Sequence, residues 1–127
     1  PEQLWALFDE QFLQQTAPLQ VVDYSVSEQR YGFKVMQNSK TLELKIEKQS
    51  RGIVECFVES LNQALGLQIN IDTYSEQSIG KGSDTEAISI CTIVRQTKEI
   101  TGAAVHRDTL LSSLQAICSA VNRSDAR

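Results

Sequence analysis

The sequence contains few of the residues on which catalysis, metal binding and nucleic-acid binding depend. It has one histidine, His106, and three cysteines, which are odd in number and match no zinc-site spacing. The net charge is −4, so there is no basic excess to attract nucleic acid or an anionic membrane. No apolar run approaches the roughly 18–20 residues of a membrane span. We therefore expect a reduced, cytoplasmic protein that binds neither nucleic acid nor membrane.

A pattern of two strands and an amphipathic helix occurs twice in the 127 residues. The first copy comprises Tyr31–Met36, Thr41–Lys48 and Gly52–Leu65, and the second comprises Glu86–Gln96, Lys98–Ala104 and Asp108–Val121. The helix starts, Ile53 and Thr109, lie 109 − 53 = 56 residues apart. Each copy alone would leave an apolar face open to water, so we expect the two to pack together or to pair with another chain.

The strands alternate apolar and polar residues, which is typical of a sheet covered on one face. In the first half of the chain, the positions predicted to point inward are Val22, Tyr24, Val26, Tyr31, Phe33, Val35, Leu42, Leu44 and Ile46. Asn38–Lys40 and Gln96–Thr97 are short and polar, as hairpin loops are. The pattern predicts an α+β fold of two pseudo-symmetric strand–strand–helix units, with antiparallel strands and the helices on one face.

Each predicted helix of the repeat has one apolar stripe and one polar side. The stripes consist of Ile53, Phe57 and Leu61 in the first helix, and of Leu110, Leu114, Ile117 and Val121 in the second. We expect Glu55, Glu59 and Asn62 to face away from the core. Asp108 stands where an N-cap belongs, and Gly66 stands where a C-cap belongs.

A further helix is predicted at the start of the chain, over Pro1–Thr16, where Leu4, Phe8 and Phe12 share one face. It ends before Pro18, because proline disfavours the helical conformation in the residue that precedes it. The chain begins with proline rather than methionine, so we expect it to be a piece of a longer protein.

No arrangement of side chains predicts an active site or a metal site. His106 has no serine or cysteine nucleophile near it in the sequence, and Cys56 and Cys118 fall on or beside apolar helical stripes. The segment Gly80–Ser83 lacks the spacing of glycines and lysine that a phosphate loop requires. We therefore predict no catalytic residue and no metal ligand in this chain.

Two glycine-bearing loops, Gln49–Gly52 and Gly102–Asp108, lead into the two helices of the repeat. Helix N-termini present unpaired backbone N–H groups and a positive dipole end, which suit a carboxylate. Beside the first loop, Val54, Ile71 and Tyr74 could enclose an alkyl group, so an aliphatic amino acid would fit. The alternative is that both loops are ordinary helix caps.

Five segments carry a family resemblance through their order and spacing. They are Glu2–Leu13, Gly52–Leu61, Gly82–Ala87, Gly102–Asp108 and Leu110–Asn122. Together they resemble the C-terminal regulatory domain of the α-isopropylmalate synthase and citramalate synthase family. The first segment looks like the helix that links this domain to the preceding one, and the others look like its two helix starts and its glycine-containing turn and loop.

The resemblance implies a domain organisation and a set of partners. Residues 1–18 would be a linker helix and residues 19–127 an effector-binding regulatory domain, with repeat one at about 19–66 and repeat two at about 67–122. The family implies a homodimer attached to a catalytic (β/α)8 domain of the same polypeptide, which needs about 250 residues and cannot lie in this chain. The divalent metal and the acetyl-CoA of the parent enzyme belong to that catalytic domain, and we expect no cofactor in this one.

The resemblance also implies an effector site. By position, its residues would be Arg51, Gly52, Val54, Glu55, Ile71, Tyr74, Ser78, Thr85, Ala87 and Thr109. The family usually has Asn-Gly-Pro where this chain has Arg51-Gly52-Ile53, and it often has glycine in place of Ala104. These departures favour the citramalate branch. We therefore expect isoleucine binding for feedback inhibition of a citramalate synthase, which condenses acetyl-CoA with pyruvate. Leucine sensing for an α-isopropylmalate synthase and dimerisation without a ligand are the alternatives.

Overall fold

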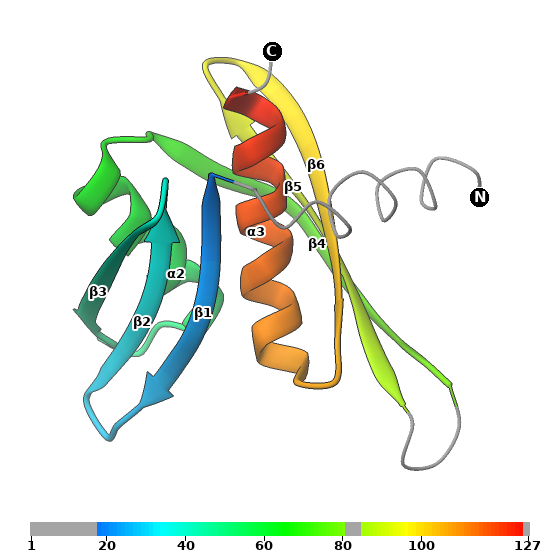
Figure 1. Cartoon of the computed structure of the whole chain (residues 1–127), viewed down its shortest axis with the longest axis horizontal. Helices are drawn as coiled ribbons and strands as arrows, with labels where there is room; N and C mark the ends of the chain where they lie inside the picture. The colour runs from blue at the N-terminus through cyan, green and yellow to red at the C-terminus, as the bar shows by residue number, and fades with distance from the viewer. Residues whose placement is uncertain (1–17, 81–84, 126–127) are drawn as a thin grey trace.

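Each half of the chain folds as three strands followed by one helix (Figure 1). The computed structural model describes residues 18–80 and 85–125. Over these residues the first unit contains β1 (Leu19–Val26), β2 (Arg30–Gln37), β3 (Lys40–Glu47) and α2 (Ile53–Leu65). The second unit contains β4 (Ile69–Ile79), β5 (Glu86–Arg95), β6 (Lys98–His106) and α3 (Thr109–Asp125). The two predicted strand–strand–helix units are confirmed, each with a third strand in front, while the helix predicted at residues 1–16 lies outside the described residues.

The second and third strands of each unit are joined by the same two-residue turn. Asn38 and Ser39 have φ angles of 50° and 72°, and Gln96 and Thr97 have φ angles of 53° and 65°. Positive φ at both turn residues gives a type I′ turn, whose twist matches that of a hairpin. Both sheets are antiparallel, with strand orders β1-β2-β3 and β4-β5-β6, so the predicted hairpins are confirmed.

A β-bulge occurs at the same place in the first strand of each unit. The strand pairing shifts between Val21 and Asp23 in β1, and between Ile71 and Thr73 in β4. The extra residue reverses the alternation of faces beyond it. The prediction that Val22 points inward is therefore wrong, and its side chain is 45% exposed.

The bulges turn one tyrosine in each unit toward the side of the sheet that the helices cover. Tyr24 stands opposite Phe33 and Tyr74 stands opposite Cys91, and both of these partners are buried. Tyr24 is thus on the predicted side of its strand. Val26 is exposed, against the prediction, because it ends an edge strand.

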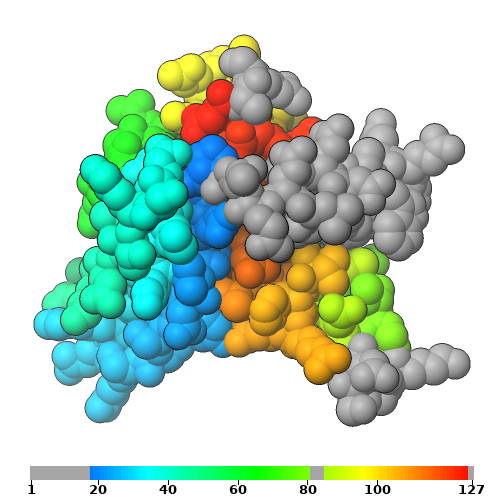
Figure 2. Space-filling view, viewed as in Figure 1, coloured from blue at the N-terminus to red at the C-terminus, as the bar shows by residue number. Residues whose placement is uncertain are grey.

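Each helix lies on the face of its own sheet and beside the first strand of the other unit. The helix α2 packs on β2 and β3 and against β4, whereas α3 packs on β5 and β6 and against β1. Figure 2 shows β1 lying between β2 and α3. The two units share one hydrophobic core, as expected from the repeat. Its largest fully buried side chains are Phe57, Leu61, Ile69, Ile93, Leu114 and Ile117.

The two sheets differ in the size of the residues beneath their helices. The fifth residue pair from the hairpin turn is Phe33 with Leu44 in the first unit and Cys91 with Gly102 in the second. A Cβ atom on Gly102 would lie 2.2 Å from the backbone nitrogen of Ala120, so α3 and β6 touch main chain to main chain. The bulky pair in the first unit prevents α2 from approaching its sheet as closely.

The ends of the helices agree with prediction in part. Gly66 ends α2 in the left-handed conformation, with φ of 66°, and its N–H donates to the carbonyl oxygen of Asn62. Leu110, predicted to lie in the apolar stripe of α3, is 38% exposed, while Ser112 and Ser113 beside it are buried. Neither of the two described helices is long and apolar enough to cross a membrane.

Candidate functional site

A groove runs between α2 and the start of β4, at the joint between the two units. It has a volume of about 420 Å³ and is lined by Arg51, Glu55, Val58, Glu59, Asn62, Ile69, Asn70 and Ile71. Three of the predicted effector residues, Arg51, Glu55 and Ile71, are therefore brought together. A cation, two carboxylates and branched apolar side chains line the same space, and this combination suits a small zwitterion with an alkyl side chain.

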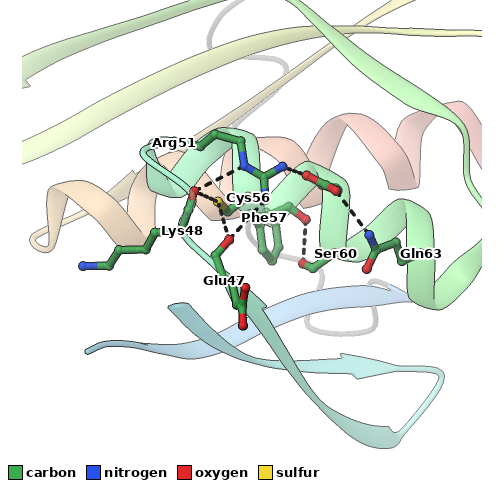
Figure 3. A network of polar contacts seen from close by, with 8 residues as sticks. Glu47, Lys48, Arg51, Cys56, Phe57, Ser60 and Gln63 are labelled. Atoms are coloured by element: carbon green, nitrogen blue, oxygen red, sulfur yellow. Dashed lines mark hydrogen bonds and ion pairs between the residues drawn. The ribbon is translucent and has the colours of Figure 1, made fainter. Parts of the chain in front are cut away.

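Arg51 reaches over the first turns of α2 from the loop after β3 (Figure 3). Its Nε donates to the carbonyl oxygen of Lys48 at 3.3 Å, and its Nη2 donates to that of Glu47 at 3.1 Å. Its Nη1 forms an ion pair with Glu59. The Glu59 carboxylate also accepts a hydrogen bond from Gln63 at 3.2 Å. Main-chain oxygens on one side and a carboxylate on the other thus hold the guanidinium at the groove.

The N-terminus of α2 has no side-chain cap. Gly52 is the N-cap residue, with an extended backbone, and no side chain within residues 18–80 and 85–125 bonds to the helix start there. A Cβ atom on Gly52 would meet nothing within 4 Å. Because no described side chain bonds the first N–H groups of α2, these groups and the positive dipole end of the helix suit an anion. Val54, another predicted effector residue, lies in this first turn and is half-buried against the core.

The N-terminus of α3, in contrast, is capped by Asp108, as the sequence predicts. The Asp108 carboxylate accepts the Leu111 N–H at 3.1 Å and the Tyr24 hydroxyl at 2.8 Å. Burial acts to raise the pKa of Asp108, but the hydrogen bonds from Leu111 and Tyr24 act against it, and the pKa is lowered overall. The hydrogen bond to Asp108 raises the pKa of Tyr24. A carboxylate of the protein itself thus occupies this helix end.

Two asparagines that the sequence does not single out join the units. The amide of Asn62 on α2 accepts the Ile69 N–H and donates to the Ile69 carbonyl oxygen, both at 2.9 Å. The amide of Asn122 on α3 bonds Leu19 in the same way, at 3.0 and 2.8 Å. The side-chain amide of each asparagine thus bonds both main-chain groups of one residue in the first strand of the other unit, as a neighbouring strand would. The expectation that Asn62 faces away from the core is wrong, because the fold brings the start of β4 against it.

The two helices differ in the number of residues between their first residue and this asparagine, and α3 has one more turn there than α2. Asn62 follows the first residue of α2 by 62 − 53 = 9 residues, and Asn122 follows the first residue of α3 by 122 − 109 = 13. The difference of four residues is about one helical turn. In the first unit, the loop that contains Arg51 and Gly52 takes the place of that turn. The pseudo-symmetry is therefore broken where the groove lies.

The remaining predicted effector residues lie farther along β4 and near the start of α3. Ser78 on β4 pairs directly with Ala87 on β5, and the Ala87 carbonyl accepts the Ser112 hydroxyl at 3.1 Å. Thr85 is exposed and lies just before β5. These residues are close to one another but do not line the groove beside α2.

Tyr74 and Thr109 are linked through Ser113. The Tyr74 hydroxyl bonds the Ser113 hydroxyl and donates to Glu76 at 2.8 Å. The Ser113 hydroxyl also lies 3.1 Å from the carbonyl oxygen of Thr109, so its single hydrogen is shared between that oxygen and the Tyr74 hydroxyl. Burial is the main cause of a raised pKa for Tyr74. Tyr74 is therefore bonded to its own unit's helix, whereas Tyr24 is bonded to the helix start of the opposite unit.

The predicted effector residues thus form two groups rather than one. Ile71 lies in the groove, and Ser78 follows it by 78 − 71 = 7 residues along β4. At about 3.3 Å per strand residue, the two positions are about 23 Å apart. A free amino acid is much shorter than that, so within one chain it contacts one group only. Of the predicted residues, Arg51, Glu55 and Ile71 line the groove, whereas Gly52 and Val54 belong to the adjacent start of α2.

Two of the cysteines and the histidine have surroundings that indicate a structural role. Burial raises the pKa of Cys91 to about 11 and that of Cys118 to about 12, which suppresses their reactive thiolate forms. The Nδ1 atom of His106 accepts the backbone N–H of Asp108 at 2.9 Å. Within residues 18–80 and 85–125, no cluster of three or more His, Cys, Asp or Glu side chains could hold a metal ion.

Curated relatives of the chain are named 2-isopropylmalate synthase. The chain is 34% identical over 82 residues, 65% of its length, to the protein of Brucella suis biovar 1. It is 27% identical over 131 residues, 98% of its length, to the protein of Paraburkholderia phytofirmans, and 28% identical over 134 residues, 97% of its length, to that of Helicobacter hepaticus. It spans 15%, 22% and 24% of these proteins respectively, so it corresponds to about a fifth of their length.

A family model also matches this chain. Residues 1–124 match the model of the LeuA allosteric (dimerisation) domain. The match covers nearly the whole chain and confirms the resemblance to the regulatory domain of the α-isopropylmalate and citramalate synthases. The function of such a domain is allosteric rather than catalytic, as expected from the sequence. The chain therefore belongs to the LeuA allosteric (dimerisation) domain family.

Proposed function

We propose that this chain is the leucine-binding allosteric domain of a 2-isopropylmalate synthase and that it mediates feedback inhibition of that enzyme. The observation that carries the proposal is the groove between α2 and β4, where Arg51, Glu55 and Ile71 lie together at the joint of the two units. The names of the relatives support leucine as the effector, because the three proteins compared above are 2-isopropylmalate synthases, the branch of the family for which leucine sensing is the expectation.

The groove offers a partner for each part of an aliphatic amino acid. The open N-terminus of α2 and the guanidinium of Arg51 suit the carboxylate. The carboxylate of Glu55, in the first turn of the helix, suits the ammonium group. Val58 and Ile71 supply apolar surface for the alkyl side chain. At about 420 Å³, the groove is within the range of about 300–1,000 Å³ that is typical of small-molecule sites.

The same chemistry is not available at the second helix. Asp108 occupies the N-terminus of α3 with its own carboxylate, and the Tyr24 hydroxyl donates to that carboxylate. An amino acid placed there would bring a second negative charge against the first, which is unfavourable. One effector per chain, at α2, is therefore the stoichiometry that we propose.

Isoleucine, with a citramalate synthase as the parent enzyme, is the alternative. It rests on the sequence Arg51-Gly52-Ile53, which departs from the usual Asn-Gly-Pro of the family. Leucine and isoleucine differ only in the position of one methyl group, and one methyl in an apolar pocket changes binding by about 1–3 kcal/mol. The apolar lining of the groove does not distinguish the two alkyl shapes, so our preference for leucine rests on the names of the relatives.

The parent enzyme and its assembly are part of the proposal. The chain corresponds to about a fifth of the relatives' length, so catalysis, the divalent metal and acetyl-CoA would belong to a (β/α)8 domain elsewhere in the same polypeptide. The family description as a dimerisation domain supports a homodimer. The exposed apolar side chain of Ile79, on the edge strand β4, is consistent with a further contact surface.

Thermal denaturation of the purified protein tests the proposal. L-leucine, L-isoleucine and L-valine are compared at equal concentration, because a ligand of the native state raises Tm by mass action. We expect the largest rise with leucine. A larger rise with isoleucine would establish the alternative effector, and the absence of any rise would leave a dimerisation domain without a ligand.

A further inference from the structure

The groove contains one cation and two carboxylates with different surroundings. Glu55 and Glu59 are four residues apart, so they project from the same side of α2. Glu59 is paired with Arg51, whereas Glu55 takes part in no ion pair within the described part of the chain. The cation that suits an effector carboxylate is thus already neutralised by the protein's own carboxylate.

The ion pair between Arg51 and Glu59 is exchangeable. The two side chains are 27% and 39% exposed, so water reaches both groups. Exposed pairs of this kind contribute only about two- to fivefold to an equilibrium constant. The guanidinium has other partners, since it also donates to the carbonyl oxygens of Lys48 and Glu47. Arg51 therefore stays in place when Glu59 leaves it.

We propose that Glu59 competes with the effector's carboxylate for Arg51 and is thus a positioning residue that sets the effector concentration at which the groove fills. The inference rests on the proposed function and adds a residue that controls it. In the effector-free protein, Glu59 neutralises Arg51. When an amino acid enters, its carboxylate replaces that of Glu59 at Arg51 and at the start of α2, and its ammonium group pairs with Glu55.

Calorimetric titration with L-leucine tests the competition. The purified protein is compared with the variants Glu59→Gln, Arg51→Gln and the double variant. Glutamine keeps the shape of the Glu59 side chain and removes its charge, so we expect Glu59→Gln to bind leucine about two- to fivefold more tightly. Arg51→Gln should weaken binding at least about tenfold, because it removes a charged hydrogen-bond partner. The double variant should bind as Arg51→Gln does, since no cation remains to compete for.

Two controls separate competition from a general effect of charge. Glu43→Gln removes the same charge from an exposed position on β3 outside the groove, and we expect it to leave leucine binding unchanged. L-leucinamide lacks the carboxylate, so its binding should be the same in the wild type and in Glu59→Gln. A gain in affinity for leucine that is specific to Glu59→Gln and absent without Arg51 would support the inference.

Two results would overturn the competition between Glu59 and the effector, and a third would overturn the proposed function. Leucine affinity that is unchanged or lower in Glu59→Gln overturns the competition, as does an equal gain in the Arg51→Gln background. If the wild type binds none of leucine, isoleucine and valine, the proposed function itself fails. If the wild type binds leucine and Glu59→Gln binds it with the same affinity, only the competition is contradicted and the proposed function stands.

Discussion

Asn62 on α2 and Asn122 on α3 form the same pair of main-chain hydrogen bonds, each to the first strand of the opposite unit. The residues that they hold, Ile69 and Leu19, are both buried. Neither unit can therefore separate from the other without leaving buried main-chain groups unpaired. Because Asn62 also lines the groove, a ligand bound there would contact the residue that joins the two units.

The first prediction concerns these asparagines. We expect Asn62→Ala and Asn122→Ala each to lower the free energy of unfolding by about 1–3 kcal/mol, because each leaves a buried N–H and a buried carbonyl without a partner. The measurement is urea denaturation followed by circular dichroism. Asn70→Ala is the matched control, since Asn70 is exposed, and it should change stability by less than about 0.5 kcal/mol. Equal effects at all three positions would contradict the role of the two asparagines.

The second prediction concerns the close contact between α3 and β6. We expect Gly102→Ala to destabilise the protein by about 1–3 kcal/mol or more. The added Cβ would lie 2.2 Å from the nitrogen of Ala120 and 2.5 Å from the carbonyl oxygen of Ala116, and neither backbone atom can move without moving the helix. Gly52→Ala is the control, because a Cβ there meets nothing within 4 Å and only the weaker N-cap of alanine, about 0.5–1 kcal/mol, should lower its stability. Similar midpoints of thermal unfolding for both variants would show that the contact is less tight than the structure indicates.

Local patterns in the sequence were sufficient for much of this fold. Period-two alternation and short polar turns predict the hairpins, and Asp108 and Gly66 predict two helix ends, because turns and caps depend on neighbouring residues. The bulge near Val22 could not be predicted, since an apolar β-branched residue fits the regular alternation equally well. A bulge is defined by its partner strand, which a local pattern does not contain.

The candidate site was predictable mainly where its residues follow one another in the chain. Arg51 and Glu55 lie at a recognisable helix start, and the structure places them together with Ile71. Glu59 and Asn62 were assigned to the solvent side because polar residues opposite an apolar helical stripe usually face water. Their partners, an arginine on a loop and the first residue of β4, come into range only through the fold.

The third prediction concerns the pH dependence of stability that arises from Tyr24 and Asp108. The pKa of Asp108 is lowered from 3.8, so its contribution is present above that value and is lost as the pH falls through the folded-state pKa. The pKa of Tyr24 is raised from 10.0, so its contribution is present below that value and is lost as the pH rises through the folded-state pKa. We expect Tyr24→Phe to weaken both dependences, as measured by urea unfolding across the acid and alkaline ranges.

Tyr31→Phe provides the control for that measurement. The Tyr31 hydroxyl donates to the carbonyl oxygen of Arg51 at 3.2 Å, so its removal also deletes a hydrogen bond but leaves Asp108 and its partners unchanged. Its unfolding free energy should fall by a similar amount at every pH in the acid range. An acid dependence that is the same in Tyr24→Phe and in the wild type would show that the Tyr24 hydroxyl does not stabilise the Asp108 carboxylate.

The last prediction concerns the open N-terminus of α2, where stability and effector binding should change in opposite directions. Gly52 is the N-cap of α2 and has an extended backbone that aspartate also adopts. An aspartate carboxylate there would accept the free N–H groups of the first turn and interact favourably with the helix dipole. We expect Gly52→Asp to raise the free energy of unfolding by about 0.3–1 kcal/mol. The same carboxylate would occupy the place of the effector's carboxylate, so leucine binding should weaken at least about tenfold.

Gly52→Asn separates the two causes of that loss. Asparagine caps helices about as well as aspartate but adds no charge, so it should stabilise α2 while weakening leucine binding less than aspartate does. Urea unfolding and calorimetric titration of the same protein samples give both quantities. Leucine binding at wild-type affinity in a stabilised Gly52→Asp variant would exclude the start of α2 as the carboxylate site. A destabilised Gly52→Asp variant would show instead that the N–H groups of this turn are not free to be capped.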